Sequence, residues 1–507
     1  MKHTNAFLAV LLMLAPHAAI SAEAPKPLRP NIVIILADDL GWGDLGCYGA
    51  TKVQTPHCDR LAKEGMRFTD AHSPCSVCTP SRYNLLTGRY AWRTWVKTGC
   101  VWADDPLFID ESRTTLPSLL RSAGYVTACV GKWHLGFGKP GMAGWDSVVG
   151  PDYNRDLKPG PLEVGFDYFF GVPHVGQIPH FFVENHRVVN LDASDPVRIL
   201  PDPNPIWNLD YLHRPRTENP NLGVSGGRQT TYLHEELATK LTEKAVAWIA
   251  QQQKERPFFL HFCARNVHAP IAPAPRFRNT SQCGSYGDFI HEFDWSVSEI
   301  LRALDEHGFT SNTMVILSSD NGAVNQGYQP GPKAEYQGHL ANGLLRGQKT
   351  EIYEGGHRVP FLVRWPGFVA PASHCDQLIA NTDLLATTAE LVGQRLADDA
   401  GEDSFSFLPA LLHQRPTQPL RGTIVHDSWK GQYAIREGNW KLLLCQGGGG
   451  LGWKAETDAT QPSGQLFNLA EDLGENRNLY KEHPEIVKRL TTLFEKIRHE
   501  NRSRPYQ

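Results

Sequence analysis

The chain has 507 residues, a formal net charge of −4 and 41% hydrophobic residues. At roughly 100–200 residues per domain, this length predicts one large domain with a smaller second one. The weakly acidic charge and the lack of a long basic tract exclude a nucleic-acid-binding protein that works through a positive surface. Ten cysteines are too few for a disulfide scaffold in so long a chain.

The N-terminus has the features of a secretory signal. Met1-Lys2-His3 is followed by an apolar run over residues 6–15 and then by small residues up to Ala22-Glu23-Ala24. A basic start, a short apolar segment and a small-residue site favour a signal peptide over residues 1–24, cleaved near Ala22 or Ala24, over an N-terminal buried helix. The run is too short to cross a bilayer, which takes roughly 20 apolar residues. We therefore expect a periplasmic or secreted protein without a membrane span.

Short apolar runs and helix-like segments alternate along most of the chain. We interpret five runs as buried parallel strands, because continuous stretches rich in valine and isoleucine suit strands that are covered on both faces. They are residues 32–36, 125–130, 258–263, 314–317 and 359–363. The amphipathic stretch 231–251 suits a helix between two of them. The pattern predicts an α/β fold with helices on both faces of a mostly parallel sheet.

The pattern changes near the C-terminus. From Gln432 onward, short alternating segments cover residues 432–445 and 464–479, separated by the glycine run 447–450. An amphipathic helix follows, because its apolar residues have helical spacing. They are Ile486, Leu490, Leu493, Phe494 and Ile497.

Polar side chains stand at the ends of the predicted strands, where ligands collect in parallel sheets. Taken singly, each has a simpler explanation as a turn, a helix cap or a surface group. Their convergence at several strand ends indicates one site. In chain order they are Asp38 and Asp39, Lys132 and His134, His268, Asp320 and Asn321, and Lys349.

The two kinds of group in this set have complementary chemistry. Asp38, Asp39, Asp320 and Asn321 offer only oxygen ligands, which suit Ca²⁺ or Mg²⁺ and not zinc. The lysines, Arg82 and the histidines are cationic or proton-donating groups that would hold an anion. A divalent cation beside several fixed cations predicts a site for a charged oxyanion such as sulfate or phosphate.

Residues 75–90 contain two cysteines three positions apart. The stretch from Cys78 through Pro80 and Arg82 to Leu85-Leu86-Thr87-Gly88-Arg89 resembles the signature of the type I sulfatases of the alkaline-phosphatase superfamily. The resemblance extends from Arg29 to near Asn476. It implies that Cys78 is converted to Cα-formylglycine (3-oxoalanine) by a formylglycine-generating or anaerobic sulfatase-maturating enzyme.

The motif also has a local physical logic. Pro80 fits the first position of a helix, with Thr79 or Cys78 near the cap and Gly88 just beyond the end. Residue 78 would then stand at a helix N-terminus, where backbone amides and the helix dipole favour an anion. Arg82, one turn along, would hold the residue 78 hydroxyl and the metal ligands.

The resemblance implies a role for each site residue. Asp38, Asp39, Asp320, Asn321 and residue 78 resemble the ligands of one Ca²⁺ ion, for which Mg²⁺ is an alternative. By the same resemblance His134 is the base that acts on the second hydroxyl of residue 78, and His268 is the acid toward the leaving alcohol. Lys132 and Lys349 would bind sulfate oxygens.

The resemblance also implies the overall organisation. It implies an alkaline-phosphatase-like catalytic domain over residues 25–415 and a smaller α+β subdomain over 416–507, with an antiparallel sheet and a closing helix. The expected substrate is a sulfated sugar or polysaccharide fragment, including N-acetylgalactosamine 6-sulfate types. Five residues are candidates to line the sugar pocket: Trp92, Trp95, Trp133, His180 and His339.

Several alternatives stay open. Cys75 lacks the Pro and Arg spacing, so it is a free thiol or a disulfide partner; a redox pair with Cys78 and half a zinc site are disfavoured. We interpret His261, inside an apolar run, as a core histidine. The rival functions are a phosphoester or phosphonate hydrolase of the same superfamily and a non-catalytic carbohydrate-binding homologue. The latter would lack a nucleophile or a metal ligand, and none is missing.

Overall fold

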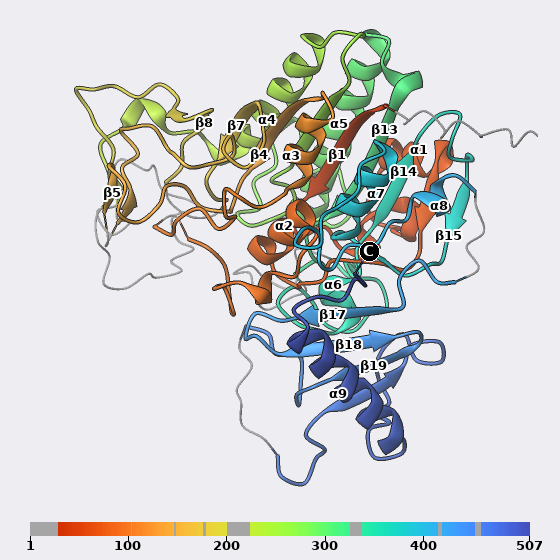
Figure 1. Ribbon diagram of the computed structural model, residues 1–507. Coiled ribbons are helices and arrows are strands. Elements are labelled where there is room, and N and C mark those ends of the chain that lie inside the picture. Colours follow the sequence, from red (N-terminus) through yellow and green to blue (C-terminus); the bar gives the residue numbers. More distant parts are fainter. Residues whose placement is uncertain are drawn as a thin grey trace, which may run out of the picture.

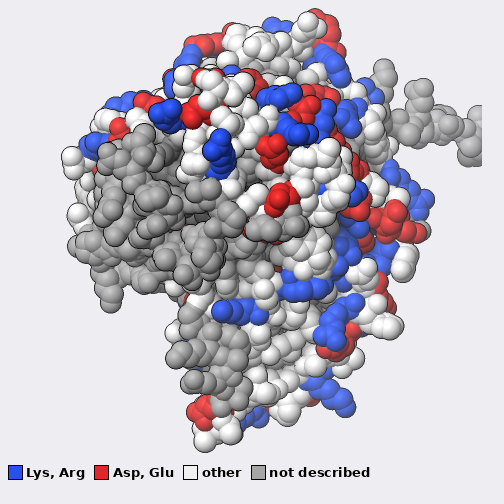
Figure 2. Space-filling model, turned by 90° about the vertical axis from the view of Figure 1, so that its left-hand side faces the viewer, with Lys and Arg blue, Asp and Glu red and all other residues white. Residues whose placement is uncertain are grey.

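The computed structural model describes residues 29–102, 104–146, 149–175, 179–199, 224–324, 337–413, 418–451 and 458–506. The predicted signal peptide, residues 1–24, and the predicted domain boundary between residues 415 and 416 lie outside these ranges. Within the described part of the chain, no helix is long and apolar enough to cross a membrane. Basic and acidic side chains are interspersed over the described surface of the face in Figure 2.

A ten-stranded sheet forms the centre of the large domain (Figure 1). Its middle strands β13, β1, β12, β4 and β7 run parallel to one another. The strands, in spatial order, are β15 (Ser373–Cys375), β2 (Met66–Phe68), β14 (Phe361–Arg364), β13 (Thr313–Ser319), β1 (Asn31–Ala37), β12 (Phe258–Cys263), β4 (Val126–Lys132), β7 (Tyr168–Val172), β8 (Val183–Glu184) and β9 (Arg187–Val188).

The five predicted strands are present, but one of them runs in the opposite direction from the prediction. The run 359–363 corresponds to β14, which pairs antiparallel with β13. An apolar run records burial on both faces and carries no information about chain direction, so the sequence pattern could not separate the two orientations.

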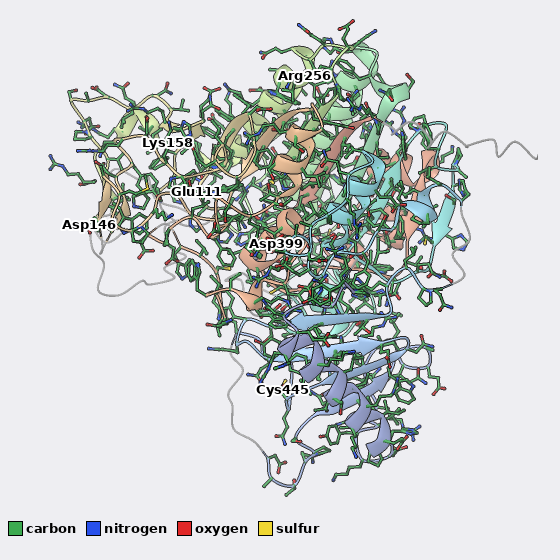
Figure 3. The ribbon with its side chains drawn as sticks, viewed as in Figure 1. Glu111, Asp146, Lys158, Arg256, Asp399 and Cys445 are labelled. Carbon is green, nitrogen blue, oxygen red and sulfur yellow. The ribbon has the colours of Figure 1, made fainter. Side chains whose placement is uncertain are left out.

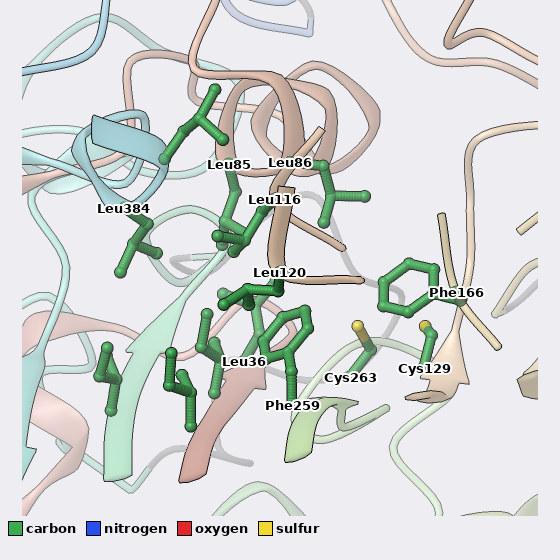
Figure 4. Close-up of a cluster of buried hydrophobic side chains, with 14 of the residues drawn as sticks. Leu36, Leu85, Leu86, Leu116, Leu120, Cys129, Phe166, Phe259, Cys263 and Leu384 are labelled. Atoms are coloured by element: carbon green, nitrogen blue, oxygen red, sulfur yellow. The ribbon is translucent and has the colours of Figure 1, made fainter. Parts of the chain in front are cut away.

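Helices cover both faces of the sheet because alternate strand residues point to opposite sides. Ile32, Ile34 and Leu36 of β1 pack in one hydrophobic cluster, whereas Val33 and Ile35 pack in the other. The first cluster contains side chains of α2 (Cys78–Thr87), α3 (Leu116–Ser122) and α7 (Asp383–Leu391), as Figure 4 shows. The second contains side chains of α1 (Pro56–Glu64), α4 (His234–Ala250) and α5 (Gly284–Glu306). The predicted helix over residues 231–251 is therefore confirmed as α4.

The smaller C-terminal part contains a second sheet. Its strands pair antiparallel in the order β17 (Thr423–Asp427), β18 (Tyr433–Glu437), β19 (Trp440–Leu443) and β20 (Gln465–Asn468). Helix α9 (Pro484–His499) buries Leu490, Phe494 and Ile497 against this sheet. The antiparallel sheet with a closing helix agrees with the expectation, and Figure 1 shows it below the large domain.

Buried charged groups join the second sheet to the large domain. Lys441 of β19 lies 3.0 Å from Glu354 of the short helix α6 (Glu354–His357), and within its own part it also pairs with Glu475 at 2.8 Å. Arg436 of β18 pairs with Asp70 at 2.7 Å. Because a buried charge is costly unless it is paired, these contacts specify how the two parts dock.

Three buried histidines lie at the same junction. The rings of His357 and His426 stack with centroids 3.6 Å apart, and His72 Nδ1 lies 3.0 Å from His357 Nδ1. Burial lowers the pKa of all three imidazoles. Ligand atoms of the three histidines lie within 4.8 Å of one another, but the near-parallel stacking of His357 and His426 leaves no point in both ring planes from which one metal ion could bind both. We therefore interpret the cluster as part of the packing between the two parts.

Candidate active site

The predicted site residues converge at the carboxyl ends of the central strands. Asp38 and Asp39 follow β1, and Asp320 and Asn321 follow β13, its neighbour in the sheet. Lys132 is the last residue of β4. This edge of the sheet is where parallel strands collect ligand-binding groups.

Helix α2 places Cys78 at the same point. The helix begins at Cys78, so Pro80 occupies the third helical position and not the first, as the sequence had suggested. Proline is tolerated there because the first amides of a helix have no carbonyl partner within it. Gly88 ends the helix in the left-handed conformation, with φ 62°, and its N–H donates to the Asn84 carbonyl, as predicted. Val77, which precedes the helix, has an apolar side chain, so the amides at the N-terminus keep their attraction for an anion.

Three buried ion pairs surround Cys78. Lys132 Nζ lies 2.8 Å from Asp38 Oδ2, and Lys349 Nζ lies 2.6 Å from Asp39 Oδ1. Burial alone would raise the pKa of Asp38, but the Lys132 ammonium, with smaller effects of His268 and Arg82, brings it down to about 2.

Arg82 completes the third pair. Its Nη2 lies 2.7 Å and its Nε 3.1 Å from Asp320 Oδ2, and its Nη1 donates to the Lys132 carbonyl at 3.1 Å. Nη2 also lies 3.4 Å from Asp38 Oδ1. Arg82 therefore holds the ends of β4 and β13 together through charge-assisted hydrogen bonds.

The three carboxylates and three cations of these pairs balance one another. A divalent cation alone would leave the buried site with excess positive charge, and a dianion alone would leave excess negative charge. A divalent cation and an anion that enter together offset each other's charge. Buried charge is tolerated only when it is paired, so the constellation suits joint binding of the two.

The oxygen groups fit a hard cation. Asn321 Nδ2 donates to Asp39 Oδ1 at 2.8 Å, while Asn321 Oδ1 is buried and accepts no hydrogen bond from any described residue. Burial, and then the negative charges of Cys78 and Asp38, raise the pKa of Asp320 well above its usual range. An orphaned amide oxygen beside crowded carboxylates is the donor set that Ca²⁺ or Mg²⁺ takes.

Ligand atoms of Asp38, Asp39, Cys78 and His268 all lie within 4.8 Å of one another. His268 therefore adjoins the predicted metal ligands. Its Nε2 lies 3.8 Å from Asp39 Oδ2, its Nδ1 lies 2.5 Å from the Ala269 carbonyl, and its side chain is 20% exposed. Of the predicted catalytic groups it lies nearest to solvent.

The Cys78 thiol lies 4.0 Å from Asp39 Oδ1. Burial would raise its pKa, but a hydrogen bond with the Cys100 thiol and the charges of Lys132 and Lys349 lower it well below the usual range. Cys100 was not predicted as a site residue. No local motif marks it, because its loop reaches the site only in the folded chain.

His134 lies beside Cys78 in a left-handed backbone conformation with φ 57°. Its N–H donates to the Pro173 carbonyl at 3.0 Å, and its ring meets the His174 ring edge-on with centroids 4.6 Å apart. Burial, followed by the Lys132 charge, lowers the pKa of His134 to about 4. It is therefore a neutral imidazole at pH 7, able to accept a proton.

His174 is a second site residue that the sequence interpretation missed. It is buried and follows β7, a strand that was not among the five predicted. Burial and the neighbouring His134 lower its pKa well below the usual range. The rule that polar groups at strand ends build the site would have found it, had the run 168–172 been recognised as a strand.

Most of the aromatic candidates for a sugar pocket lie in the interior. Trp92 packs against Phe494 and Trp133 against Phe169, and both are buried. His180 and His339 are buried as well, and of the five candidates only Trp95, 55% exposed, lies at the surface. His261 is a core histidine as predicted, stacked on Phe166 at 6.4 Å with an angle of 6° between the rings.

All ten cysteines are free thiols. Cys75 Sγ donates to Asp427 Oδ2 at 3.3 Å, so Cys75 anchors its segment to β17. Cys129 and Cys263 lie side by side in the core cluster (Figure 4), and Cys445 lies in the C-terminal part (Figure 3).

Comparisons with known proteins identify the family of the chain. A family model described as Sulfatase matches residues 30–394. The N-acetylgalactosamine-6-O-sulfatase of Bacteroides thetaiotaomicron is 39% identical over 491 residues, covering 93% of each chain. The human N-acetylgalactosamine-6-sulfatase is 31% identical over 501 residues, covering 94% of this chain and 86% of its own.

A solved structure from work on glycosaminoglycan metabolism by Bacteroides thetaiotaomicron superposes with a TM-score of 0.83 at 38% identity. It covers 92% of this chain and 99% of that one. The fold, with its large mostly parallel sheet and small C-terminal antiparallel sheet, is therefore that of a solved relative.

Proposed function

The chain belongs to the sulfatase family, whose members hydrolyse sulfate esters, and we propose that it is an exported, calcium-dependent carbohydrate sulfatase acting through formylglycine made from Cys78. N-acetylgalactosamine 6-sulfate is the proposed substrate, since the bacterial and human relatives carry that name. The observation that carries the proposal is the position of Cys78, at the N-terminus of α2 between three buried carboxylates and three buried cations.

The metal would be held by oxygens of Asp38, Asp39, Asp320 and Asn321, together with residue 78. The orphaned Asn321 Oδ1 and the raised pKa of Asp320 support this assignment. When bound, a divalent ion supplies positive charge that polarises a sulfate oxygen. Oxygen donors favour Ca²⁺, with Mg²⁺ as the alternative.

The thiol of Cys78 is the precursor of the nucleophile in this proposal. Formylglycine, once made and hydrated, supplies two hydroxyls on one carbon, so that one attacks sulfur and the other allows the sulfate to leave. The neutral His134 imidazole, beside residue 78, accepts the proton of the second hydroxyl.

The remaining groups act on the substrate. Lys132 and Lys349 bind sulfate oxygens by exchanging part of their contact with Asp38 and Asp39 for the anion. His268, the group nearest to solvent, donates a proton to the alcohol oxygen as the bond to sulfur breaks. Arg82 keeps the strand ends, and with them the metal ligands, in register.

Export and maturation complete the proposal. The basic and apolar N-terminus would direct the chain to the periplasm or outside the cell, and a formylglycine-generating or anaerobic maturating enzyme would act on Cys78. The Pro80 and Arg82 of the signature would be read in the unfolded chain, because both are buried in the folded protein.

The test combines mass spectrometry with a substrate panel. Protein purified from an exporting host that contains a maturation enzyme is digested, and the peptide around residues 75–89 is measured for conversion of Cys78. The panel contains N-acetylgalactosamine 6-sulfate and 4-sulfate, glucosamine 6-sulfate, and a phosphate and a phosphonate ester of the same alcohol.

We expect conversion at Cys78, turnover of sulfate over phosphate esters, and preference for the galactosamine 6-sulfate. Full activity with an unmodified thiol would refute the nucleophile. Preferred turnover of phosphate or phosphonate esters with two bound zinc ions would identify the rival hydrolase. Binding of sulfated sugar without turnover by the converted protein would identify the non-catalytic homologue.

A further inference from the structure

Two loops from opposite ends of the chain meet beside the catalytic groups. The Gly99 N–H donates to the Trp429 carbonyl at 3.0 Å, and a Cβ added at Gly99 would lie 3.6 Å from the Trp429 indole. The indole of Trp429 therefore lies against bare backbone. The ring of Trp102 meets it edge-on, with centroids 6.3 Å apart and an angle of 60°.

Backbone hydrogen bonds connect Trp429 to the segment that carries Lys349. Trp429 follows β17, and its N–H donates to the Thr350 carbonyl at 3.0 Å. Thr350 is the neighbour of Lys349 and its N–H donates to the Ser76 carbonyl at 2.8 Å, two residues before Cys78. Thr350 has φ 79°, a strained value for a β-branched residue, which persists only where the surroundings impose it.

Trp102 is fixed from the other side. It lies two residues beyond Cys100, whose thiol contacts Cys78, and the intervening Val101 N–H donates to Thr79 Oγ1 at 3.2 Å. Both tryptophans are thus held within a few residues of groups that the sulfate would touch.

This side of the site faces solvent. Cys78 is buried, whereas Cys100 beside it is partly exposed. Trp102 and Trp429 are also partly exposed. A substrate that brings its sulfate to residue 78 along this route would pass the two indoles.

We propose that Trp102 and Trp429 form a platform, a corner of two indoles that meet at 60°, against which the pyranose ring carrying the sulfate packs. A pyranose presents a face of polarised C–H groups, which suits the electron-rich face of an indole, and binding sites fix ligands with aromatic walls of this kind. The inference rests on the proposed function and deepens it: the platform selects a sugar as leaving group, while the sulfate is held elsewhere.

The chain supplies a matched control. Trp295 lies on α5, is partly exposed like the two platform indoles, and packs against Phe277 at 5.8 Å. Because α5 covers the face of the sheet opposite α2, removing Trp295 deletes a partly exposed indole without touching the platform.

The experiment compares Trp102→Ala, Trp429→Ala, the two Trp→Phe variants and Trp295→Ala in the matured protein. Each is assayed for KM and kcat on the sulfated sugar that the wild type hydrolyses, and for inhibition by inorganic sulfate. We expect each platform Ala variant to raise KM about 10-fold, about 1.4 kcal/mol. The Phe variants recover most of this loss, and Trp295→Ala behaves as wild type.

Inhibition by inorganic sulfate separates the platform from a structural role. Sulfate is held by the lysines and the metal, so its inhibition constant stays unchanged in the platform variants. An unchanged KM in both Ala variants overturns the inference, and so does a parallel weakening of sulfate inhibition, which would mean that the loops only position catalytic groups. If the wild type hydrolyses no sulfated sugar, the proposed function fails and this inference with it; a wild type that is active beside unaffected variants refutes the platform alone.

Discussion

Replacing Arg82 with methionine tests the idea that this buried cation holds the strand ends of the site together. Arg82→Met removes three charge-assisted hydrogen bonds, two to Asp320 at 2.7 and 3.1 Å and one to the Lys132 carbonyl at 3.1 Å. The methionine side chain fills much of the same space, so the change removes charge and hydrogen bonds more than packing.

The expected loss in the free energy of unfolding comes from the Asp320 carboxylate, which stays buried without its partner. Removing one partner of a buried ion pair costs about 3–5 kcal/mol, because the other charge stays buried and uncompensated. The pKa of Asp320 is already raised by burial, so this carboxyl can take up a proton and limit the loss. We therefore expect Arg82→Met to lower the free energy of unfolding by about 3 kcal/mol, near the lower end of this range.

Thermal unfolding at pH 7 measures the effect. A midpoint falls by about 2–4 °C per kcal/mol in a domain of 150–250 residues and by less in a larger one, so roughly 3–6 °C is expected in EDTA. Arg60→Met is the control, because Arg60 forms an exposed pair with Glu64 that contributes about 0–1 kcal/mol. With calcium in excess the penalty of Arg82→Met should shrink, since a bound cation neutralises Asp320.

Two results would refute this reasoning. One is a midpoint for Arg82→Met in EDTA that matches that of Arg60→Met, which would show that Asp320 does not depend on its partner. The other is an equal penalty with and without calcium, which would place the cation away from Asp320.

Three further predictions concern the charges of the site and the docking of the C-terminal sheet. Because three carboxylates balance three cations, calcium and inorganic sulfate should each raise the affinity for the other by the same factor; calorimetric titrations of calcium with and without sulfate measure it, and independent binding would contradict the charge balance. His134→Ala should lower kcat by about 10²–10⁴-fold while sulfate inhibition persists, since a general base is lost and the anion site remains; a kcat near the wild-type value would exclude His134 as the base. Burial holds the pKa values of the junction histidines His72, His357 and His426 below the ordinary histidine value of about 6.5 in the folded state, so between those values and 6.5 the unfolded chain binds more protons. Their contribution is present above pH 6.5 and is lost as the pH falls below it, by up to about 1.4 kcal/mol per pH unit for each group. In the His426→Gln variant the unfolding midpoint should therefore fall less between pH 7 and pH 5 than in the wild type. An equal fall in the two proteins would show that His426 does not contribute to the pH dependence.

Much of the candidate site could be predicted from the sequence, because its signals are local. Burial on both faces of a parallel sheet leaves continuous apolar runs, and the residues after each run must lie at one edge. Asp38, Lys132 and Asp320 were found in this way. The signature around Cys78 is equally local, since one helix positions the cysteine, the proline and the arginine together.

Other features depend on contacts between distant segments and left no local trace. The direction of β14 is set by its pairing with β13, and the same apolar run would serve either direction. Trp92 and Trp133 have the composition expected of a sugar pocket but are buried, because exposure is a property of the folded neighbourhood.

The sequence by itself determined the fold class and predicted the nucleophile precursor and the charged groups of the candidate site, because these follow from periodicity and from short motifs at strand ends. Only the tertiary structure decided which carboxylate each cation contacts, since Lys132 and Asp38 are 94 positions apart. It also placed Cys100 beside Cys78 and His174 beside His134, and it brought together Trp102 and Trp429, which we propose to contact the sugar. The Trp429 loop reaches the site because β17 docks through the Cys75 thiol and the chain around Ser76. Local patterns specify individual helices and strands. The surface that we propose contacts the substrate is formed by packing between segments that are distant in the sequence.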